Sequence, residues 1–230
     1  MALVGDALSH VALPGLALGI LFGFYPFLGA FAFLATSAVV TWQLQKSTEL
    51  PVESIIGVIF VLALAVGILI TPQIDLLEAL FGDVSSVTLT DLSITVAVSA
   101  LVVVVLQSIY DKVALGMISR ELAVSSRINV DRINLIYLLL VSTIVALGIK
   151  EVGTLLVGAV VIVPAAAARN ISSGLHRFSL LSGIFGVISA VVGVVAAGIS
   201  GLPAGPLVVV AGAVLFSAGI ALRSSILVRA

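Results

Sequence analysis

The sequence predicts an all-α membrane protein, a bundle of about eight transmembrane helices. The first observation is composition: of 230 residues, 61% are hydrophobic and 9% are charged, against about 25% charged residues in an average soluble domain. The second is that the apolar residues gather in stretches close to the roughly 20 residues that a helix needs to cross the hydrocarbon core. Both observations place the chain among integral membrane proteins.

The apolar stretches define the predicted spans, and short turns that contain glycine or proline separate several of them. In chain order the spans are Val4–Phe22, Phe24–Trp42, Ile55–Ile70, Leu92–Leu106, Leu135–Ile149, Val152–Ala168, Leu180–Ile199 and Pro206–Leu222. The turns are predicted at Gly23–Pro26, Lys150–Gly153 and Gly201–Pro206. Pro164, within the sixth span, cannot donate to the carbonyl of Val160, so we expect a bend there that serves either gating or shape.

The distribution of lysine and arginine predicts the orientation of the spans. If both termini are cytoplasmic and the spans alternate, nine of the ten basic residues lie inside and Lys150 alone lies outside. The nine are Lys46, Lys112, Arg120, Arg127, Arg132, Arg169, Arg177, Arg223 and Arg229. The segment Thr71–Asp91 is then external, and it carries four acidic residues and no basic one. Such a rim attracts cations modestly.

The first span contains a carboxylate and an imidazole, at Asp6 and His10. Residues four apart share one face of a helix, so these two side chains could hold one ion between them. Pro14 has no N–H to offer the carbonyl of His10, which leaves that oxygen available beside the imidazole. Mixed oxygen and nitrogen donors suit divalent metals such as Mn²⁺ and Zn²⁺. The alternative is that the pair caps the helix or binds a neighbouring helix.

Two stripes of small residues predict close helix packing. Gly15, Gly19 and Gly23 form the first stripe, and Ser182, Gly186 and Ala190 form the second. Small residues at intervals of four let helix backbones approach in membranes. We interpret both stripes as packing surfaces, because the same spacing occurs in membrane helices of every function.

The longest internal polar segment is Tyr110–Asn134, which the charge distribution places in the cytoplasm. Within it, Ser119–Val124 has the pattern of a short helix that begins at a serine cap. A soluble partner could bind this helix. The alternative is a solvated loop that carries positive-inside charges and binds nothing.

Several functions are excluded by missing motifs. None of the three lysines follows the glycine pattern of a phosphate-binding loop, so any ATP must be used by another chain. The two histidines form no metalloprotease motif, and the absence of cysteine excludes thiolate metal sites and disulfides. The net charge of −1 gives no sign of a nucleic-acid partner. We therefore expect neither an enzyme nor a resident cofactor.

Four stretches together resemble the permease subunits of divalent-metal ATP-binding-cassette (ABC) importers, which carry manganese, zinc or iron. The stretches are Gly5–His10 with Leu13–Gly15, Leu80–Asp83 with Leu89–Leu92, Val152–Leu156 with Val163–Ala166 and Arg169, and Pro203–Pro206. The resemblance spans nearly the whole chain. It implies a single transmembrane domain, residues 1–230, similar to the vitamin B12 type of importer, in the inner (cytoplasmic) membrane.

The resemblance also implies partners and site residues. Two copies of the chain would form a homodimeric pore within membrane lipid, two ATPase subunits would bind below it, and an extracytoplasmic binding protein would deliver the metal ion. The family's pore ligands correspond to Asp6 and His10. Its coupling helix, within the cytoplasmic segment 111–134, corresponds to about Met117–Ser126. The contact residues there are Met117, Ser119, Arg120, Glu121, Leu122 and Ala123.

The chain departs from the family pattern in two places. Family members usually begin with another hydrophobic span, whereas Met1 falls almost on the first motif here. Arg127 stands where the family commonly has glycine, which affects how the coupling helix ends. Two other classes remain open: an ion-driven secondary transporter, although the inverted repeats typical of that class are not found, and a non-transporting scaffold, which leaves Asp6 and His10 without a role.

Overall fold

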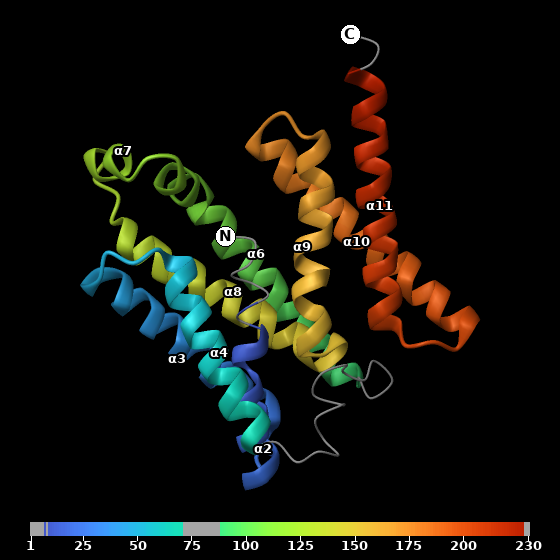
Figure 1. Ribbon diagram of the computed structural model, residues 1–230, viewed down its shortest axis with the longest axis horizontal. Coiled ribbons are helices and arrows are strands. Elements are labelled where there is room, and N and C mark those ends of the chain that lie inside the picture. The colour runs from blue at the N-terminus through green and yellow to red at the C-terminus, as the bar shows by residue number, and fades with distance from the viewer. Residues whose placement is uncertain (1–6, 8, 71–87, 228–230) are drawn as a thin grey trace.

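The computed structural model describes residues 7, 9–70 and 88–227, and all regular elements among them are helices. Figure 1 shows their arrangement. The helices are α2 (Leu13–Phe22), α3 (Pro26–Ser47), α4 (Val52–Ile70), α6 (Leu89–Ile118), α7 (Arg120–Ser125), α8 (Val130–Val152), α9 (Thr154–Ile171), α10 (Leu175–Ser200) and α11 (Ala204–Leu227). The predicted all-α class is confirmed.

Every predicted span corresponds to a helix, although the helices differ in length. Within the described residues, six helices are long and apolar enough to cross a membrane, judged by length and composition. They belong to α3, α4, α6, α8, α10 and α11. Two further apolar helices are shorter, Ser9–Phe22 and Leu156–Ile171, and they match the predicted first and sixth spans. Pro164 lies inside α9, as predicted.

Helix α6 differs most from the boundaries that were predicted for it. The span predicted at Leu92–Leu106 is a helix of 30 residues that ends at Ile118. Its start is set by a capping box, in which Thr88 and Asp91 satisfy each other's backbone N–H groups. The first part of the predicted polar segment, residues 110–118, therefore continues α6, and the cytoplasmic position of the segment stays a prediction. Hydropathy marks where a helix leaves the apolar layer, whereas the helix itself ends where its hydrogen bonding ends.

Glycine or proline residues form three of the turns between consecutive helices. Gly23 ends α2 with a left-handed backbone (φ 69°), and Pro26 begins α3. Gly201 ends α10 in the same way (φ 70°). At the turn predicted over Lys150–Gly153, only Gly153 interrupts the helix, since α8 continues to Val152. Glycine adopts positive φ without the steric cost that other residues meet.

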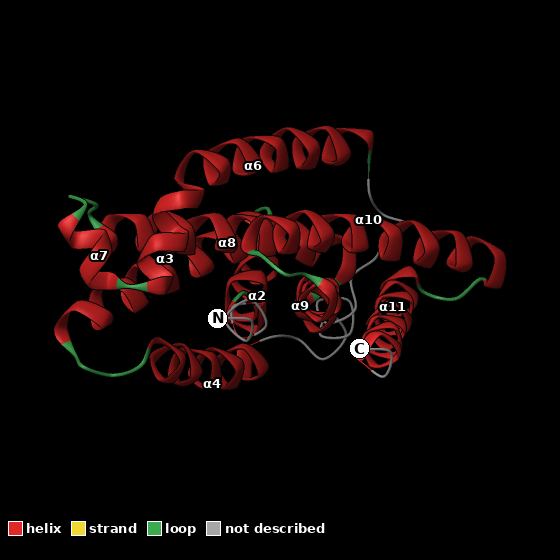
Figure 2. Cartoon of the chain, turned by 90° about the horizontal axis from the view of Figure 1, so that it is seen from above, coloured by secondary structure: helices red, strands yellow, loops and turns green. Residues whose placement is uncertain are grey.

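The helices pack as two neighbouring groups. Helix α2 packs against α3 and α4, and α3 packs against α8. Helices α9, α10 and α11 pack on one another, and α8 contacts α9. Figure 2 shows α6 at one edge of the bundle and α4 at the opposite edge, with α8 and α2 between them. The main apolar core joins the first group to α9, and it includes Val11, Leu34, Ile56, Val145 and Val157.

The first stripe of small residues is confirmed as a packing surface at two of its three positions. A Cβ atom on Gly15 would overlap the carbonyl of Gly29, and one on Gly19 would lie 2.5 Å from Cα of Pro26. The backbones of α2 and α3 therefore touch. Gly23 has a different role, because it forms the end of α2 and nothing lies within 4 Å of its Cβ position.

Gly186, the middle residue of the second predicted stripe, makes no close contact with another helix within the described chain. A Cβ atom on Gly186 would meet nothing within 4 Å. The close approach of α10 to α11 occurs instead at Gly193, whose Cβ position lies 2.5 Å from Val208. Helix α11 in turn approaches α9 at Gly212, beside Val163. The spacing of small residues predicted close packing on α10, but it did not indicate which face of the helix would be covered.

Candidate ion-binding site and polar cavity

His10 lies on the helical turn that precedes α2, in the interior of the first helix group. Its neighbours Ser9 and Val11 are buried, and its own Nδ1 atom is buried. The imidazole lies against Phe60 of α4, with ring centroids 5.4 Å apart and an interplanar angle of 56°. An aromatic wall on one side limits the directions from which an ion could reach this ring.

The backbone after His10 is held in place by close packing against α4. Leu13 and Pro14 lie against Gly67, where a Cβ atom would come within 2.9 Å of Leu13 and 3.3 Å of Pro14. Pro14 stands in the first turn of α2, a position that suits proline because its missing N–H would have no partner there. Both residues are buried. The turn that carries His10 is thus fixed by packing on its C-terminal side.

Asp6 lies outside the described residues, so the predicted pairing of Asp6 with His10 stays a prediction. Among the described residues, no group of three or more histidine, cysteine, aspartate or glutamate side chains could hold a metal ion. The external motif predicted at Leu80–Asp83 also lies outside the described part of the chain. Its companion motif, Leu89–Leu92, is described, and there Asp91 caps α6 and accepts a hydrogen bond from the Tyr25 hydroxyl at 3.2 Å.

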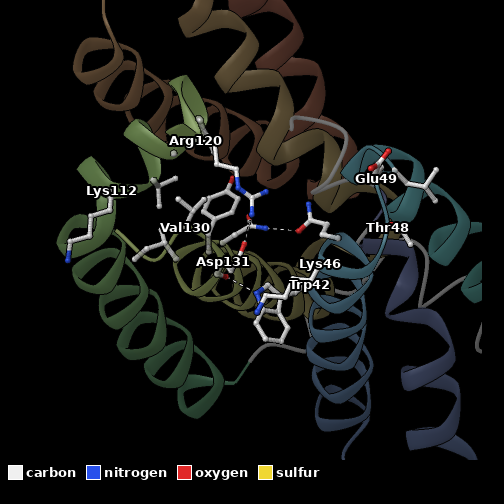
Figure 3. A pocket seen from close by; sticks show the side chains of 16 residues that line it. Trp42, Lys46, Thr48, Glu49, Lys112, Arg120, Val130 and Asp131 are labelled. Carbon is white, nitrogen blue, oxygen red and sulfur yellow. Dashed lines mark hydrogen bonds and ion pairs between the residues drawn. The ribbon is translucent and has the colours of Figure 1, made fainter. Parts of the chain in front are cut away.

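A polar cavity of about 550 Å³ opens at the end of the bundle that carries α7. It lies between the C-terminal ends of α3 and α6, the link that follows α3, and the first turns of α8 (Figure 3). Its lining combines charged, aromatic and aliphatic side chains: Trp42, Gln45, Lys46, Thr48, Glu49, Leu50, Lys112, Val113, Gly116, Met117, Arg120, Val130, Asp131, Ile133, Asn134 and Tyr137.

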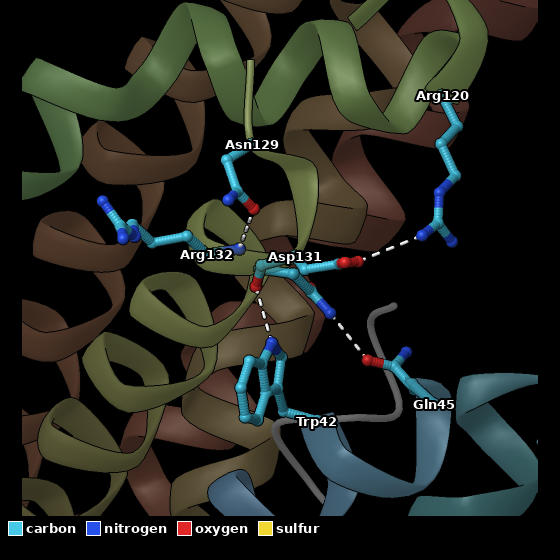
Figure 4. Close-up of polar contacts among 7 residues, drawn as sticks. Trp42, Gln45, Arg120, Asn129, Asp131 and Arg132 are labelled. Carbon is cyan, nitrogen blue, oxygen red and sulfur yellow. Dashed lines mark hydrogen bonds and ion pairs between the residues drawn. The ribbon is translucent and has the colours of Figure 1, made fainter. Parts of the chain in front are cut away.

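Asp131 connects three helices at the wall of this cavity (Figure 4). Its carboxylate Oδ1 lies 3.0 Å from Nη2 of Arg120 on α7. Its backbone carbonyl accepts a hydrogen bond of 2.7 Å from Nε1 of Trp42 on α3. One turn further along α8, the Asn134 amide donates to Oε1 of Gln45 at 2.7 Å. Helix α7 is therefore linked to α3 through the first turn of α8.

These contacts orient α7 relative to α3 and α8, but they contribute little to the stability of the fold. The side chains of Arg120 and Asp131 are 70% and 39% exposed, and exposed ion pairs contribute about 0–1 kcal/mol. The hydrogen bond from Trp42 is half-buried and contributes about 1 kcal/mol. The Lys46 amine lies 3.9 Å from the centre of the Trp42 ring, a cation–π contact.

The predicted serine-capped helix is confirmed as α7. The Ser119 hydroxyl accepts a hydrogen bond from the Leu122 N–H at 3.3 Å, and Glu121 lies in the first turn. Ala123 is fully buried, whereas Leu122 and Val124 are exposed. The coupling helix predicted at about Met117–Ser126 begins later, at Arg120, because Met117 belongs to the end of α6. The role of Met117, Ser119, Arg120, Glu121, Leu122 and Ala123 in coupling stays a prediction.

Arg127 ends α7 in the left-handed conformation that usually selects glycine. Its φ is 59°, the one positive φ of a non-glycine residue in the described chain. The Ile128 N–H donates to the carbonyl of Ala123 at 3.0 Å, and the Arg127 N–H donates to that of Val124 at 2.9 Å. This pair of bonds is the Schellman arrangement of a helix end. The position that the sequence marked as unusual for arginine is thus unusual in its backbone as well.

The sequence alone did not single out Trp42, Gln45 or Asp131. The sequence contains only a weak indication of this cluster. Trp42 is the sole tryptophan and stands at the end of a predicted span, but aromatic residues mark the membrane boundary in any membrane protein. Their contacts join residues 89 positions apart. Such pairing depends on how α3 and α8 rotate against each other, and hydropathy does not determine that rotation.

The fold and these sites define a multi-pass, all-helical membrane protein with a half-buried histidine and a polar cavity beside a short capped helix. The chain belongs to the ABC 3 transport family, which it matches over residues 1–223. It is 32% identical over 191 residues to the manganese transport system membrane protein MntC of Halalkalibacterium halodurans, an alignment that covers 81% of this chain and 65% of that protein.

Other relatives give the same family assignment. The chain is 30% identical to the manganese import system permease protein ScaB of Streptococcus gordonii, over 81% of this chain and 68% of ScaB. It is 31% identical to the high-affinity zinc uptake system membrane protein ZnuB of Haemophilus influenzae, over 75% of this chain and 68% of ZnuB. The chain thus spans about two thirds of the length of the relatives that it matches.

A solved structure shares the fold. The structure described as PsaBC from Streptococcus pneumoniae in complex with Fab superposes with a TM-score of 0.77 at 29% sequence identity. The superposition covers 95% of this chain and 80% of that chain. The family assignment and the arrangement of helices therefore agree.

Proposed function

We propose that the chain is the membrane-spanning permease subunit of an ABC importer that passes divalent transition-metal ions, Mn²⁺, Zn²⁺ or Fe²⁺, into the cytoplasm. The observation that carries this proposal is the family match over residues 1–223, together with relatives named for manganese and zinc transport. An ATPase in a separate subunit drives the transport, since this sequence has no phosphate-binding loop. The relatives do not favour a secondary transporter or a scaffold.

The proposed assembly places the chain in the cytoplasmic membrane with both termini inside. A second copy completes the pore, an extracytoplasmic protein delivers the metal ion, and the ATPase binds at α7. The positions of the basic residues support this orientation. In Figure 1 the α3–α4, α6–α7 and α9–α10 connections lie at the upper or left edge, and the α2–α3, α8–α9 and α10–α11 turns lie at the lower or right edge. Lys46, Arg120 and Arg169 belong to the first set.

The metal step is assigned to Asp6 and His10. A transporter must bind its ion strongly enough to remove part of the hydration shell and weakly enough to release it, so a few donors suit transit better than a closed cage. The imidazole must be neutral to act as a ligand. The packing of His10 against Phe60 supports this role, because it holds the ring in one place inside the bundle.

Uptake in cells tests the function. Cells that lack their own importer receive the chain with its ATPase and binding protein, and accumulation of radioactive Mn²⁺ or Zn²⁺ is measured. We expect accumulation only when all three are present, and none when the ATPase carries a substitution that blocks hydrolysis. Equal accumulation with the inactive ATPase would contradict the proposal and favour an ion-driven transporter.

Charge reversal on α7 tests the coupling role. The double variant Arg120→Glu with Glu121→Arg should leave the fold intact, because the Arg120–Asp131 pair is exposed and contributes little to stability. We expect metal uptake to fall at least tenfold while the assembled complex still hydrolyses ATP, since charge complementarity determines which surfaces bind. Arg177→Glu, on the exposed first turn of α10, is the matched control and should transport normally. Normal coupled transport by the double variant would count against docking through these two residues.

A further inference from the structure

The polar cavity beside α7 carries more positive than negative charge. Its charged lining residues are Glu49, Asp131, Lys46, Lys112 and Arg120. The Asp131 carboxylate binds Arg120. The Lys46 amine lies over the Trp42 ring, and no carboxylate of the described residues lies within ion-pair distance of it. A surplus of positive charge in a recessed site favours an anionic ligand.

Figure 3 shows which of these side chains point into the cavity. Arg120 reaches inward from α7, and Lys46 lies across from it at the end of α3, beside Trp42. The Glu49 carboxylate and the Lys112 amine both point outward, away from Arg120. The interior of the cavity is therefore dominated by the cations of Arg120 and Lys46.

Both cations have hydrogen-bond donors to spare. A guanidinium group has five N–H donors and an ammonium group has three. In the described chain, Arg120 uses one of its nitrogens on Asp131 at 3.0 Å, and the Lys46 amine contacts the face of an aromatic ring. The remaining donors come from two different helices, α7 and α3. Phosphate oxygens accept hydrogen bonds from such charged donors strongly.

The cavity lies at the level where α3 leaves the apolar layer. Lys46 is the first charged residue of α3, and Trp42 precedes it by one turn. Tyr137 of α8 also lines the cavity. Tryptophan and tyrosine gather at the boundary between membrane and water, and lysine side chains extend from there to the lipid headgroups. A phosphate at this level belongs most naturally to a lipid.

The cavity also adjoins helix faces that lipid can reach. Helices α3 and α6 flank it, and both pack on α8. Further into the membrane, Val40 and Leu44 of α3 and Val104 of α6 are exposed. Figure 2 shows α6 at the edge of the bundle opposite α4, the helix that contacts His10. We expect a pore completed beside His10 to leave the α6 edge facing lipid.

We propose that this cavity binds the phosphate headgroup of an anionic phospholipid, which Lys46 and Arg120 contact while the acyl chains lie on α3 and α6. Basic pockets between membrane helices bind such headgroups on the cytoplasmic side. The assignment to the cytoplasmic leaflet rests on the orientation in the proposed function. The volume of about 550 Å³ falls within the range of about 300–1,000 Å³ that is usual for small-molecule sites. The bound lipid would join α3 to α7.

The fluorescence of Trp42 tests this inference, because Trp42 is the sole tryptophan of the chain and lines the cavity. The purified chain is placed in phosphatidylcholine vesicles that contain a fixed minor fraction of lipid brominated close to the headgroup, which quenches an adjacent indole. We expect brominated phosphatidylglycerol to quench Trp42 at least twice as strongly as the same fraction of brominated phosphatidylcholine. Lys46→Gln should remove this preference, and Lys46→Arg should retain it. The ratio of the two lipids cancels any direct effect of Lys46 on the indole.

Lys112→Gln is the matched control. It removes the same charge from the same cavity, at a side chain whose amine points outward, so the preference should remain. Both lysines are exposed, and each variant should unfold at the parental temperature. A preference that survives Lys46→Gln, or that falls equally with Lys112→Gln, would show general attraction to the surface and overturn the inference.

Two further outcomes would also overturn it. Equal quenching by the two lipids in the parental chain would show that the cavity does not select an anionic lipid, as when a second copy covers it. Loss of the preference in excess inorganic phosphate would show that a free anion is the ligand. The measurement needs neither ATPase nor metal, so a failure of the proposed function would leave the quenching unchanged and would be seen separately in the uptake assay.

Discussion

Uptake of Mn²⁺ or Zn²⁺ is expected to fall to background when either Asp6 or His10 is replaced by alanine. Both residues act on the same ion, so the loss of either one removes the site, and the double variant should be no worse than the single ones. Such non-additivity is the sign of two groups that work as one unit. Membrane insertion should be unaffected, because neither substitution adds charge or volume to the first span.

His176→Ala is the matched control for this prediction. It removes the other histidine of the chain, which is exposed on the first turn of α10, and it should transport at the parental rate. The measurement is the initial rate of radioactive metal uptake, normalised to the amount of protein in the membrane. Parental rates for either Asp6→Ala or His10→Ala would show that the pair is structural.

The second large effect is expected at the contact between α2 and α3. Gly29→Ala places a methyl group against the carbonyl of Gly15, where neither backbone can move without separating the helices. Overpacking of this kind costs about 1–3 kcal/mol and occasionally more. We expect a clearly lower unfolding temperature of the purified protein in detergent, and less protein in the membrane.

Gly57→Ala supplies the control for this substitution. Gly57 lies inside α4, and a Cβ atom there would meet nothing within 4 Å. Alanine favours the helix by up to about 1 kcal/mol relative to glycine, so this variant should be as stable as the parent or slightly more stable. Equal unfolding temperatures for Gly29→Ala and Gly57→Ala would mean that α2 and α3 do not touch as described.

Features set by local chemistry were predictable from the sequence. Hydropathy located a helix for each predicted span, because the requirement to bury apolar residues acts on one helix at a time. The cap of α7 at Ser119 and the turn at Gly23 were found because each depends on a few neighbouring residues. The unusual arginine at position 127 was also noticed, and its positive φ gives the physical reason.

Features set by the meeting of distant helices were not predictable. The hydrogen bonds from Trp42 to Asp131 and from Asn134 to Gln45 depend on how α3 rotates against α8. Gly15 was singled out but its partner Gly29 was not. Gly186 has no close contact within the described chain for the same reason: small residues permit a close contact, and the remaining helices decide whether one forms. The pairing of Asp6 with His10 is still a prediction.

Transport by the purified complex in lipid vesicles tests the central claim most directly. The chain, its ATPase and its binding protein are reconstituted, and accumulation of radioactive Mn²⁺ or Zn²⁺ is followed with ATP supplied on the ATPase side. We expect accumulation that requires ATP hydrolysis, persists when proton and sodium gradients are dissipated, and disappears with His10→Ala. Accumulation that follows an ion gradient and is indifferent to ATP would contradict the claim that this chain is an ABC importer permease.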